Sequence, residues 1–423
     1  MLSTEDNELL TRTGPGTPMG NLFRRFWLPA LLPRELPNPD SDPIRFRMLG
    51  EDLIAFRDTS GRVGFIQNNC PHRGASLFFG RNEENGLRCV YHGWKFDVTG
   101  QCVDMPNEPA ESNFKTKVRA RAYPSAEDAG LVWIYMGPAD KQPELPQYEW
   151  CMQSNADQSL TRKWLQDSNY SQGHEGQLDS AHIAFLHGGR PPGAPARPGR
   201  GAGYNAPQLT VRETDFGFVY GARRPAEGGN YYWRVTANVL PTVSEIPSAF
   251  VRGSATFILP RDDEHSWWFY VTPPPAAGEE ANLKDERLTP GDASPTETGG
   301  FLDDKSFRRA RNRDNDYLID RAVQRTTNYT GLPGNRVQDA MVTESMGAIY
   351  DRGHERLGTT DMAIIFWRRQ LIRLARDLDR GIEPPVLTHP DWFRVQPIDI
   401  VHAEPSFERL WDARETLVDA RKA

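Results

Sequence analysis

The sequence predicts an α+β chain of two domains, in which a small all-β domain precedes a larger domain whose antiparallel sheet grips a long C-terminal helix. Three observations indicate this class. The length of 423 residues exceeds that of a usual single domain. Short runs of β-branched and aromatic residues, separated by tight turns, fill the first part of the chain. Longer strand-like segments follow, and then a stretch with apolar residues at helical spacing.

Changes in composition predict the boundaries. Residues 1–38 should form a short helix, a Pro/Gly-rich connector and an aromatic segment that straps across the protein body. Residues 39–140 should form the all-β domain and residues 141–423 the second domain. The proline-rich segment Pro138–Pro146 should link the two.

Strand signals are clearest in the all-β domain. Arg45–Leu49 and Leu53–Phe56 flank a Gly-Glu-Asp turn, and Val63–Gln67 follows a Thr-Ser-Gly turn. Leu131–Tyr135 closes the domain. A domain of many short strands presents its loops at one tip, and we expect functional residues there.

The second domain should begin with a helix over about 167–186. Strands should follow over Leu209–Arg223, Tyr231–Ile246 and Ala255–Val271, the last folded into a hairpin at Arg261–His265. The remaining expected elements are helices over about 303–328, 337–351 and Asp361–Asp379.

Two stretches lack periodicity. Gly188–Pro207 consists mostly of Gly, Pro and Ala and should be a mobile or functional loop, and Thr272–Gly300 should be an exposed insertion. The last helix carries an apolar side that should pack on the sheet. That side contains Ile364, Ile365, Trp367, Leu371 and Leu374.

Composition excludes several function classes. The net charge of -7 and the pI of about 5.8 argue against nucleic acid or an anionic membrane as partner, although an acidic surface suits a basic redox protein. No apolar stretch is long enough to span a membrane. Four cysteines do not make a disulfide framework, and the acidic segment Met1–Leu10 is no export signal. We therefore expect a cytoplasmic protein.

Two cysteines and two histidines form the strongest motif. Cys70-x-His72 is followed by Cys89-x-x-His92, so each of two loops supplies one thiolate and one imidazole. This donor set suits a [2Fe–2S] cluster of the Rieske kind, in which the cysteines ligate one iron and the histidines the other. The alternative is a structural zinc site, but zinc sites usually pair like with like along the chain.

The residues beside these ligands also favour the cluster. Pro71 and Gly74 stiffen and tighten the first loop, and Gly93 lets backbone N–H groups approach a sulfur closely.

A second metal site is predicted around His182 and His187. Two histidines and one carboxylate, with open positions, form the facial triad of non-haem Fe(II) enzymes. The two histidines are five positions apart, about 140° round an ideal helix, so the helix must unwind before His187, and Gly188-Gly189 would permit this. A lone histidine on an apolar helix is usually a hydrogen-bonded core residue, but a cluster in the same chain needs an electron acceptor.

The carboxylate ligand is predicted to be Asp339. On the helix expected over 337–351 it shares an apolar stripe, and an acid on such a stripe must be paired, neutralised or bound to a cation. Glu344 and Asp351 fall off the stripe and should be solvated, and Asp361 suits a helix start. The stripe contains Val342, Met346 and Ile349.

Together these residues resemble the Rieske non-haem iron oxygenases, specifically the large (α) oxygenase subunit of the phthalate dioxygenase type, over nearly the whole chain. The matching motifs are Cys70-Pro-His72-Arg-Gly, Cys89-Val-Tyr-His92-Gly-Trp-Lys-Phe-Asp, Asn169-x-x-Gln172-x-x-Glu175-Gly-x-x-Asp179-x-x-His182-x-x-x-x-His187, and Gln338-Asp339 followed by Glu344-Ser-Met-Gly and Leu357-Gly-Thr-Thr-Asp361.

The resemblance implies Fe(II) held by His182, His187 and, most simply, Asp339. It also implies a homotrimer or a dimer of trimers, in which Asp179 bridges one subunit's cluster histidine to the next subunit's His182. Alternatively Asp179 merely orients His182, and both roles can hold at once.

The resemblance adds Glu175 and Asn169, which belong to the same motif, to the expected catalytic residues. An NAD(P)H-dependent flavin and iron–sulfur reductase would feed the cluster. The enzyme would use O2 to convert an aromatic carboxylate to a cis-dihydrodiol. Arg223, Arg234 and Arg252 lie on candidate cavity strands and are the candidates for binding the carboxylate.

Three alternatives remain open. A monooxygenase with the same metals could O-demethylate or hydroxylate a methyl group of a substituted benzoate or arenesulfonate. An electron-transfer protein could carry the cluster without oxygenase activity. A zinc-binding interaction module is the third.

Overall fold

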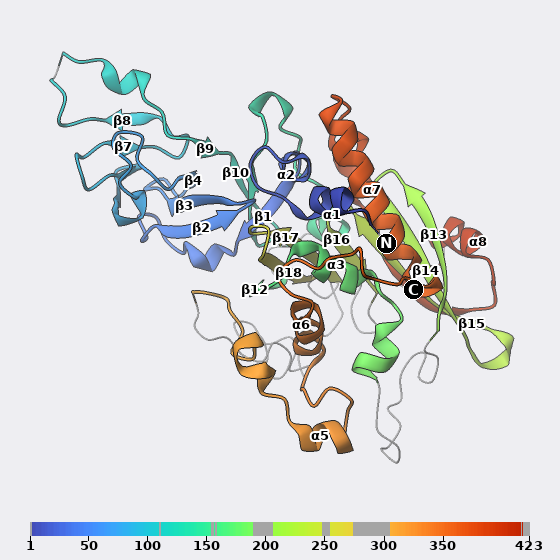
Figure 1. Ribbon diagram of the computed structural model, residues 1–423. Helices are drawn as coiled ribbons and strands as arrows, with labels where there is room; N and C mark the ends of the chain where they lie inside the picture. Colours follow the sequence, from blue (N-terminus) through green and yellow to red (C-terminus); the bar gives the residue numbers. More distant parts are fainter. Residues whose placement is uncertain are drawn as a thin grey trace.

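The computed structural model describes residues 2–109, 111–153, 156, 159–188, 206–247, 254–273, 305–415 and 417. Figure 1 shows two parts, with the short strands of the all-β domain at one end and the larger sheet with helix α7 at the other. This arrangement confirms the predicted fold class. The expected loop Gly188–Pro207 and the insertion Thr272–Gly300 lie largely outside the described residues.

The N-terminal segment forms a strap, as expected. Helix α1 (Thr4–Thr11) begins at Ser3, whose hydroxyl accepts a hydrogen bond from the Asp6 N–H. Part of the expected connector is also helical, because Thr17 caps helix α2 (Pro18–Phe23) and Pro18 occupies its first turn. Strand β1 (Trp27–Leu31) then pairs with β11 (Leu131–Tyr135) in the sheet order β1-β11-β10.

Two four-stranded antiparallel sheets make up the all-β domain among the described residues. The first has the order β2-β3-β4-β9 and the second β5-β6-β7-β8. Their strands are β2 (Ile44–Met48), β3 (Glu51–Arg57), β4 (Val63–Gln67), β5 (Arg81–Glu83), β6 (Gly86–Arg88), β7 (Lys95–Phe96), β8 (Cys102–Asp104) and β9 (Ala122–Tyr123). Strand β10 (Ser125–Asp128) belongs instead to the three-stranded sheet with β1 and β11.

One antiparallel sheet, eight-stranded in the described residues, organises the second domain. Its order is β12-β18-β17-β16-β15-β14-β13, and β19 pairs with the N-terminal half of β15. The predicted strand segment at Leu209 is itself a hairpin, because the chain turns between β13 and β14. The strands are β12 (Leu160–Gln166), β13 (Gln208–Thr214), β14 (Gly217–Pro225), β15 (Tyr231–Val239), β16 (Val243–Ile246), β17 (Ser254–Pro260), β18 (Ser266–Thr272) and β19 (Ile398–His402).

The C-terminal helix α7 (Met362–Asp379) agrees with its prediction to within one residue and packs beside β13 and β14 (Figure 1). Trp367 and Leu371 on its apolar side are buried. Helices α3 (Tyr170–Leu178) and α6 (Asn335–Ser345) are shorter than expected, and α8 (Phe407–Asp412) was not predicted.

The single helix predicted over 303–328 is wrong. The described part instead contains the short turn η10 (Arg313–Leu318) and helix α5 (Arg321–Thr326). Asp316, Tyr317 and Leu318 have positive φ angles, which no continuous right-handed helix allows.

Short one- or two-turn segments complete the described structure. They are η1 (Pro33–Glu35), η2 (Leu77–Phe79), η3 (Phe114–Lys117), η4 (Ala139–Lys141), η5 (Glu149–Met152), η7 (Ile183–His187), η8 (Glu227–Gly229), η11 (Thr359–Asp361), η12 (Pro385–Thr388) and η13 (Pro390–Phe393). Among the described residues, no helix is long and apolar enough to cross a membrane.

Backbone hydrogen bonds and a buried ion pair hold the two domains together. The N–H groups of Leu49 and Gly50, in the β2–β3 turn, donate to carbonyls of the β17–β18 hairpin at 3.0 Å. Lys163 of β12 is fully buried and contacts Glu35 of the strap at 2.9 Å. Four aromatic rings surround its ammonium group. They belong to Phe46, Trp267, Phe269 and Phe307.

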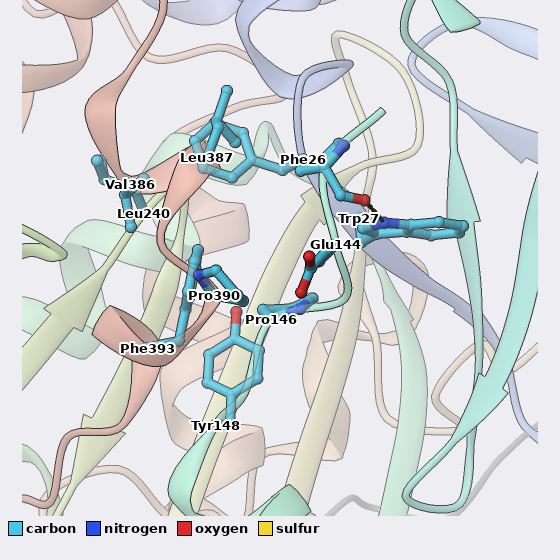
Figure 2. A pocket seen from close by; sticks show the side chains of 11 residues that line it. Phe26, Trp27, Glu144, Pro146, Tyr148, Leu240, Val386, Leu387, Pro390 and Phe393 are labelled. Carbon is cyan, nitrogen blue, oxygen red and sulfur yellow. Dashed lines mark hydrogen bonds between the residues drawn. The ribbon is translucent and has the colours of Figure 1, made fainter. Parts of the chain in front are cut away.

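The expected linker Pro138–Pro146 is packed rather than free. The Trp27 indole donates to the carbonyl of Pro143 at 2.9 Å. Figure 2 shows the apolar hollow that this segment borders, with the strap on one side and the C-terminal turns on the other. The hollow includes Tyr148 and Phe393 but none of the predicted metal ligands.

Candidate functional site

The first candidate centre lies in two matching loops at the tip of the all-β domain. In the first loop the Gly74 N–H donates to the Cys70 carbonyl at 2.9 Å, and in the second the Gly93 N–H donates to the Cys89 carbonyl at 3.0 Å. Both glycines have positive φ angles. A Cβ on Gly93 would lie 2.5 Å from Pro106, so the second loop has no room for a larger residue.

The four predicted ligands meet between these loops. The thiols of Cys70 and Cys89 are buried and hydrogen-bonded to each other, and the rings of His72 and His92 lie 4.5 Å apart. Burial raises the pKa of Cys70 to about 11, while backbone N–H groups of His72 and Arg73 donate to its sulfur. The buried Nδ1 of His92 has no hydrogen-bond partner. A group that takes two thiolates and two imidazole nitrogens therefore fits here, as a [2Fe–2S] cluster does.

Trp94 fixes one of these rings. Its indole stacks on His72 at 4.3 Å with 10° between the planes, and its Nε1–H donates to Asn107 at 2.7 Å. The indole thus sets the plane of His72 and shields one face of the ring from water.

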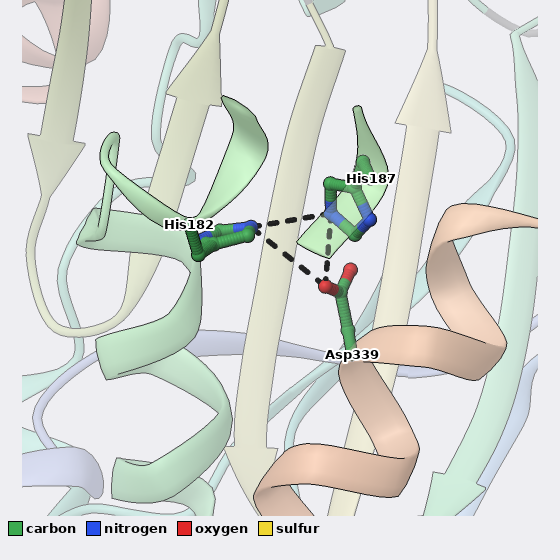
Figure 3. Close-up of side chains that lie close together, drawn as sticks. All are labelled: His182, His187 and Asp339. Carbon is green, nitrogen blue, oxygen red and sulfur yellow. Dashed lines mark hydrogen bonds and ion pairs between the residues drawn. The ribbon is translucent and has the colours of Figure 1, made fainter. Parts of the chain in front are cut away.

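The second candidate centre joins His182, His187 and Asp339 (Figure 3). The Nε2 atom of His187 lies 3.2 Å from Nε2 of His182 and 3.1 Å from Oδ1 of Asp339, and the third side of the triangle is 3.8 Å. Two imidazole nitrogens and one carboxylate oxygen thus point at one place. They are the donor set of a 2-His-1-carboxylate iron site.

The local backbone differs from the prediction. The helix does unwind before His187, as expected, but nine residues earlier rather than next to Gly188, because α3 ends at Leu178. The chain then forms the π turn η7 (Ile183–His187), in which the Gly188 N–H donates to the Ile183 carbonyl at 3.1 Å. A π turn needs more residues per turn than an α-helix, so positions five apart come onto one side. This widening brings His182 to His187.

Neighbouring polar side chains lie beside both rings. The Nδ1 atom of His187 lies 2.8 Å from Oε1 of Gln338, whose amide group in turn donates to the Leu332 carbonyl. Asp179 accepts from the His182 N–H at 3.2 Å, and its other oxygen lies 3.6 Å from Nδ1 of the same ring. Such partners fix the tautomer of a metal-binding histidine.

Asp339 lies where the sequence placed it, but the stripe argument is wrong. The buried face of α6 consists of Val337, Gln338, Ala340, Thr343 and Glu344, whereas Met346 of the proposed stripe is exposed. Glu344, predicted to be solvated, is buried between Tyr317 and Arg309.

Asn169 and Glu175 have packing contacts that lie away from the triad. Asn169 caps α3 and donates to the carbonyls of Thr11 and Asp263. Burial raises the pKa of Glu175, but Arg352 at 2.9 Å and Arg368 at 2.8 Å outweigh burial and hold that pKa below its usual value. Both residues thus hold α3, which leads into the segment with the two histidines, rather than contacting the triad.

The three predicted arginines differ in placement. Arg223 faces away from the triad, where it bonds Gln208 and the Pro405 carbonyl and stacks over Tyr231. Arg252 lies outside the described residues. Arg234 lies on the side of the sheet that α3 covers, where Asn238 contacts His174, and its charge acts on His182.

Sequence reasoning missed Arg224. It alternates with Arg223 on β14 and therefore faces the same side of the sheet as Arg234 on β15. Its Nη2 atom donates to the Ser180 carbonyl at 2.8 Å, whereas its buried Nη1 atom has no partner. Burial, together with repulsion from Arg234, lowers the pKa of Arg224.

Comparison with known proteins agrees with these two centres. The model of the Rieske [2Fe-2S] domain matches residues 26–124, and the model described as LigXa C-terminal domain like matches residues 134–392. The chain is 39% identical over 415 residues to the 3-chlorobenzoate-3,4-dioxygenase oxygenase subunit of Comamonas testosteroni, covering 93% of each chain. It is 40% identical over 385 residues to the phthalate 4,5-dioxygenase oxygenase subunit of Pseudomonas putida, covering 88% of this chain and 86% of that one.

Solved structures share the fold at lower identity. NdmA of Pseudomonas putida CBB5, a QL mutant with theobromine, has a TM-score of 0.58 and 18% identity, covering 90% of this chain and 98% of the other. Dicamba monooxygenase bound to dicamba has a TM-score of 0.57 and 17% identity, covering 85% and 98%.

The fold and the two centres define an oxidoreductase with an electron-transfer cluster and a separate iron site. The chain belongs to the Rieske aromatic ring-hydroxylating oxygenases, as an oxygenase α subunit. Its cofactors are a Rieske [2Fe–2S] cluster and mononuclear non-haem iron. Membership of this family excludes two of the alternatives raised from the sequence, an electron-transfer protein without oxygenase activity and a zinc-binding interaction module. As an oxygenase subunit, it depends on a ferredoxin or reductase for electrons.

Proposed function

We propose that this subunit uses O2 and electrons from an NAD(P)H-dependent flavin and iron–sulfur reductase to dihydroxylate a phthalate-like aromatic carboxylate to a cis-dihydrodiol in the cytoplasm. The observation that carries the proposal is the position of Arg234, which lies on the same side of the sheet as Arg224 and whose charge acts on His182. The relatives at 39% and 40% identity, named for dioxygenation of 3-chlorobenzoate and phthalate, support the same class.

Seven residues would hold the cofactors. The residues that would ligate the cluster are Cys70, His72, Cys89 and His92, and those that would ligate the iron are His182, His187 and Asp339. Bound there, the two groups supply single-electron transfer and the activation of O2. The protein fixes the ligand rings through Trp94 and Gln338 before any substrate arrives.

Electron transfer would require a second copy of the chain. In Figure 1 strands β7 and β8, which lie beside the cluster loops, are at one end of the molecule, whereas α6 lies below its middle. We therefore place the cluster of one subunit beside the iron of the next, in a trimer or a dimer of trimers. Asp179 would bridge them, because it is partly exposed and already contacts His182.

The substrate carboxylate would lie between the two arginines. A guanidinium binds a carboxylate through paired N–H groups, and desolvation strengthens the interaction. Arg224 offers an unpartnered Nη1 in a buried place, which would make that interaction strong. The carboxylate would orient the ring so that the same two carbons always face the iron ligands, and the closed site would exclude water.

A second candidate is O-demethylation or methyl hydroxylation by the same residues. The chain is 30% identical over 418 residues to the 5,5'-dehydrodivanillate O-demethylase oxygenase subunit of Sphingobium, covering 97% of this chain. The ligands are the same for either reaction, so the position of the ring decides the outcome.

Product analysis with 18O2 tests the proposal. The reconstituted enzyme, given benzoate, 3-chlorobenzoate, phthalate and methoxybenzoates, should place two labelled atoms in one diol. One labelled atom together with formaldehyde would establish the monooxygenase instead. Arg234→Leu should raise KM for benzoates more than it lowers kcat. If rings without a carboxylate stimulated O2 uptake as well as the benzoates do, the role of the arginines would be refuted.

A further inference from the structure

A row of polar side chains crosses the sheet of the catalytic domain. Asn238 of β15 is paired with Ser244 of β16, Ser244 with Thr256 of β17, and Thr256 with Tyr270 of β18. Side chains alternate along a strand, so directly paired residues face the same side of a sheet. These side chains therefore stand next to one another on one face.

Helices α3 and α6 cover this face. The Nε2 atom of His174 on α3 lies 2.6 Å from Oδ1 of Asn238, and the guanidinium of Arg336 on α6 lies 4.3 Å from the centre of the Tyr270 ring. The chain runs from α3 directly to the two histidines of the triad, and α6 carries its aspartate. The strands drawn behind the triad in Figure 3 agree with this placement, so the row forms the floor of the iron-containing side of the domain.

Four polar atoms of this floor are buried without a hydrogen bond. Within the part of the chain that the structure describes, they are Asn238 Nδ2, Ser244 Oγ, Thr256 Oγ1 and His174 Nδ1, and all four residues are 0% exposed. Proteins rarely leave one such atom unsatisfied, and a group of four indicates that water or a ligand completes them.

The floor is uncharged. Burial lowers the pKa of His174 to about 4, so its ring is neutral at physiological pH. Because Oδ1 of Asn238 can only accept, the ring proton is on Nε2 and Nδ1 is left as an acceptor. The amide of Asn238 donates, and the two hydroxyls do both. Two cations lie at the Tyr270 end of the row. Arg336 of α6 lies over the Tyr270 ring, and Arg162 is paired with Tyr270, two strands, about 10 Å, beyond Thr256.

We propose that Asn238, Ser244 and Thr256 bind an uncharged oxygen substituent of the aromatic ring, a hydroxyl group in the simplest case, opposite the carboxylate held by Arg234. Arg234 and Asn238 face the same side of β15, and their Cα atoms are about 13 Å apart along the strand. The inference rests on the proposed function and narrows it to carboxylates with a second, neutral polar group.

The test compares ligands that differ by one hydroxyl. Binding of benzoate, 3-hydroxybenzoate and 4-hydroxybenzoate to the iron-loaded holoenzyme is measured by anaerobic calorimetry. At least one hydroxybenzoate should bind more tightly than benzoate. Thr256→Val, which keeps the shape and removes the hydroxyl, should weaken that hydroxybenzoate about tenfold and benzoate less than twofold.

A matched control lies on the opposite face of the same sheet. Thr161 of β12 is also buried with an unpartnered hydroxyl, so Thr161→Val makes the same chemical change away from the site and should alter neither affinity. The thermal midpoint of Thr256→Val should not fall, because the variant loses a buried hydroxyl that has no protein partner.

The outcomes separate the two proposals. This inference fails, and the proposed function stands, if benzoate binds but no hydroxybenzoate binds more tightly. The same holds if Thr256→Val lowers the affinity for all three ligands equally, and in either case only water fills the floor. If no ring carboxylate binds the wild type, the proposed function fails and this inference with it.

Discussion

The buried charge of Glu175 gives the sharpest test of how the iron-ligating segment is held. Its carboxylate contacts Arg352 and Arg368, whose side chains are 0% and 4% exposed. Glu175→Gln keeps the shape but leaves two buried guanidinium groups without this counter-charge. Removing one partner of a buried ion pair costs about 3–5 kcal/mol. We expect about 3 kcal/mol, because the amide oxygen still accepts one hydrogen bond and Glu355 still pairs with Arg368.

The pH dependence follows from the lowered pKa of Glu175. A carboxylate with a folded-state pKa below its unfolded value stabilises the fold fully above the unfolded value, near 4.3, and this contribution is lost as the pH falls through the folded value. The difference between wild type and Glu175→Gln should therefore be full at pH 7 and shrink below about pH 4.

Urea unfolding followed by tryptophan fluorescence measures both effects. The control is Glu213→Gln, which makes the same change in the exposed pair with Arg373, where the side chains are 47% and 53% exposed. An exposed pair contributes at most about 1 kcal/mol. Equal losses in the two variants, or a Glu175→Gln loss that does not shrink between pH 7 and about pH 3, would refute the reasoning.

Two further predictions concern the ligand rings. Gln338→Leu removes the hydrogen bond to His187 and should weaken iron binding about 10–100-fold in competition with a chelator; unchanged affinity would mean that the ring is held by packing alone. Trp94→Leu removes the ring stacked on His72 and should shift the reduction potential of the cluster and speed its loss in air; an unaltered potential and lifetime would contradict the stacking role.

The candidate cofactor ligands could be named from the sequence because they lie in short motifs. Each cluster loop contains its own cysteine, histidine and glycine, so the spacing of these residues along the chain was enough to indicate the cluster site. Asp339 lies beside the two histidines as expected, but the apolar stripe from which it was inferred is not the buried face of α6. The π turn that unites His182 and His187 has no signal in residue spacing, because it depends on how α3 ends.

The substrate side was less predictable because it depends on strand register. Arg223 and Arg224 are neighbours in sequence, yet they face opposite sides of β14, and only the pairing with β15 decides which one faces the triad. The row at Asn238, Ser244 and Thr256 likewise joins three strands. The register of these strands is set by how distant parts of the chain pack together, and a single sequence does not show that packing.

The central claim is that the chain holds an electron-transfer cluster and a separate iron between His182, His187 and Asp339. Iron analysis combined with EPR spectroscopy of wild type and Asp339→Asn tests it most directly. The wild type should contain about three irons per chain, and the variant about two, with an unchanged signal of the reduced cluster and no product. A variant that keeps the third iron and turns over benzoates would contradict the account.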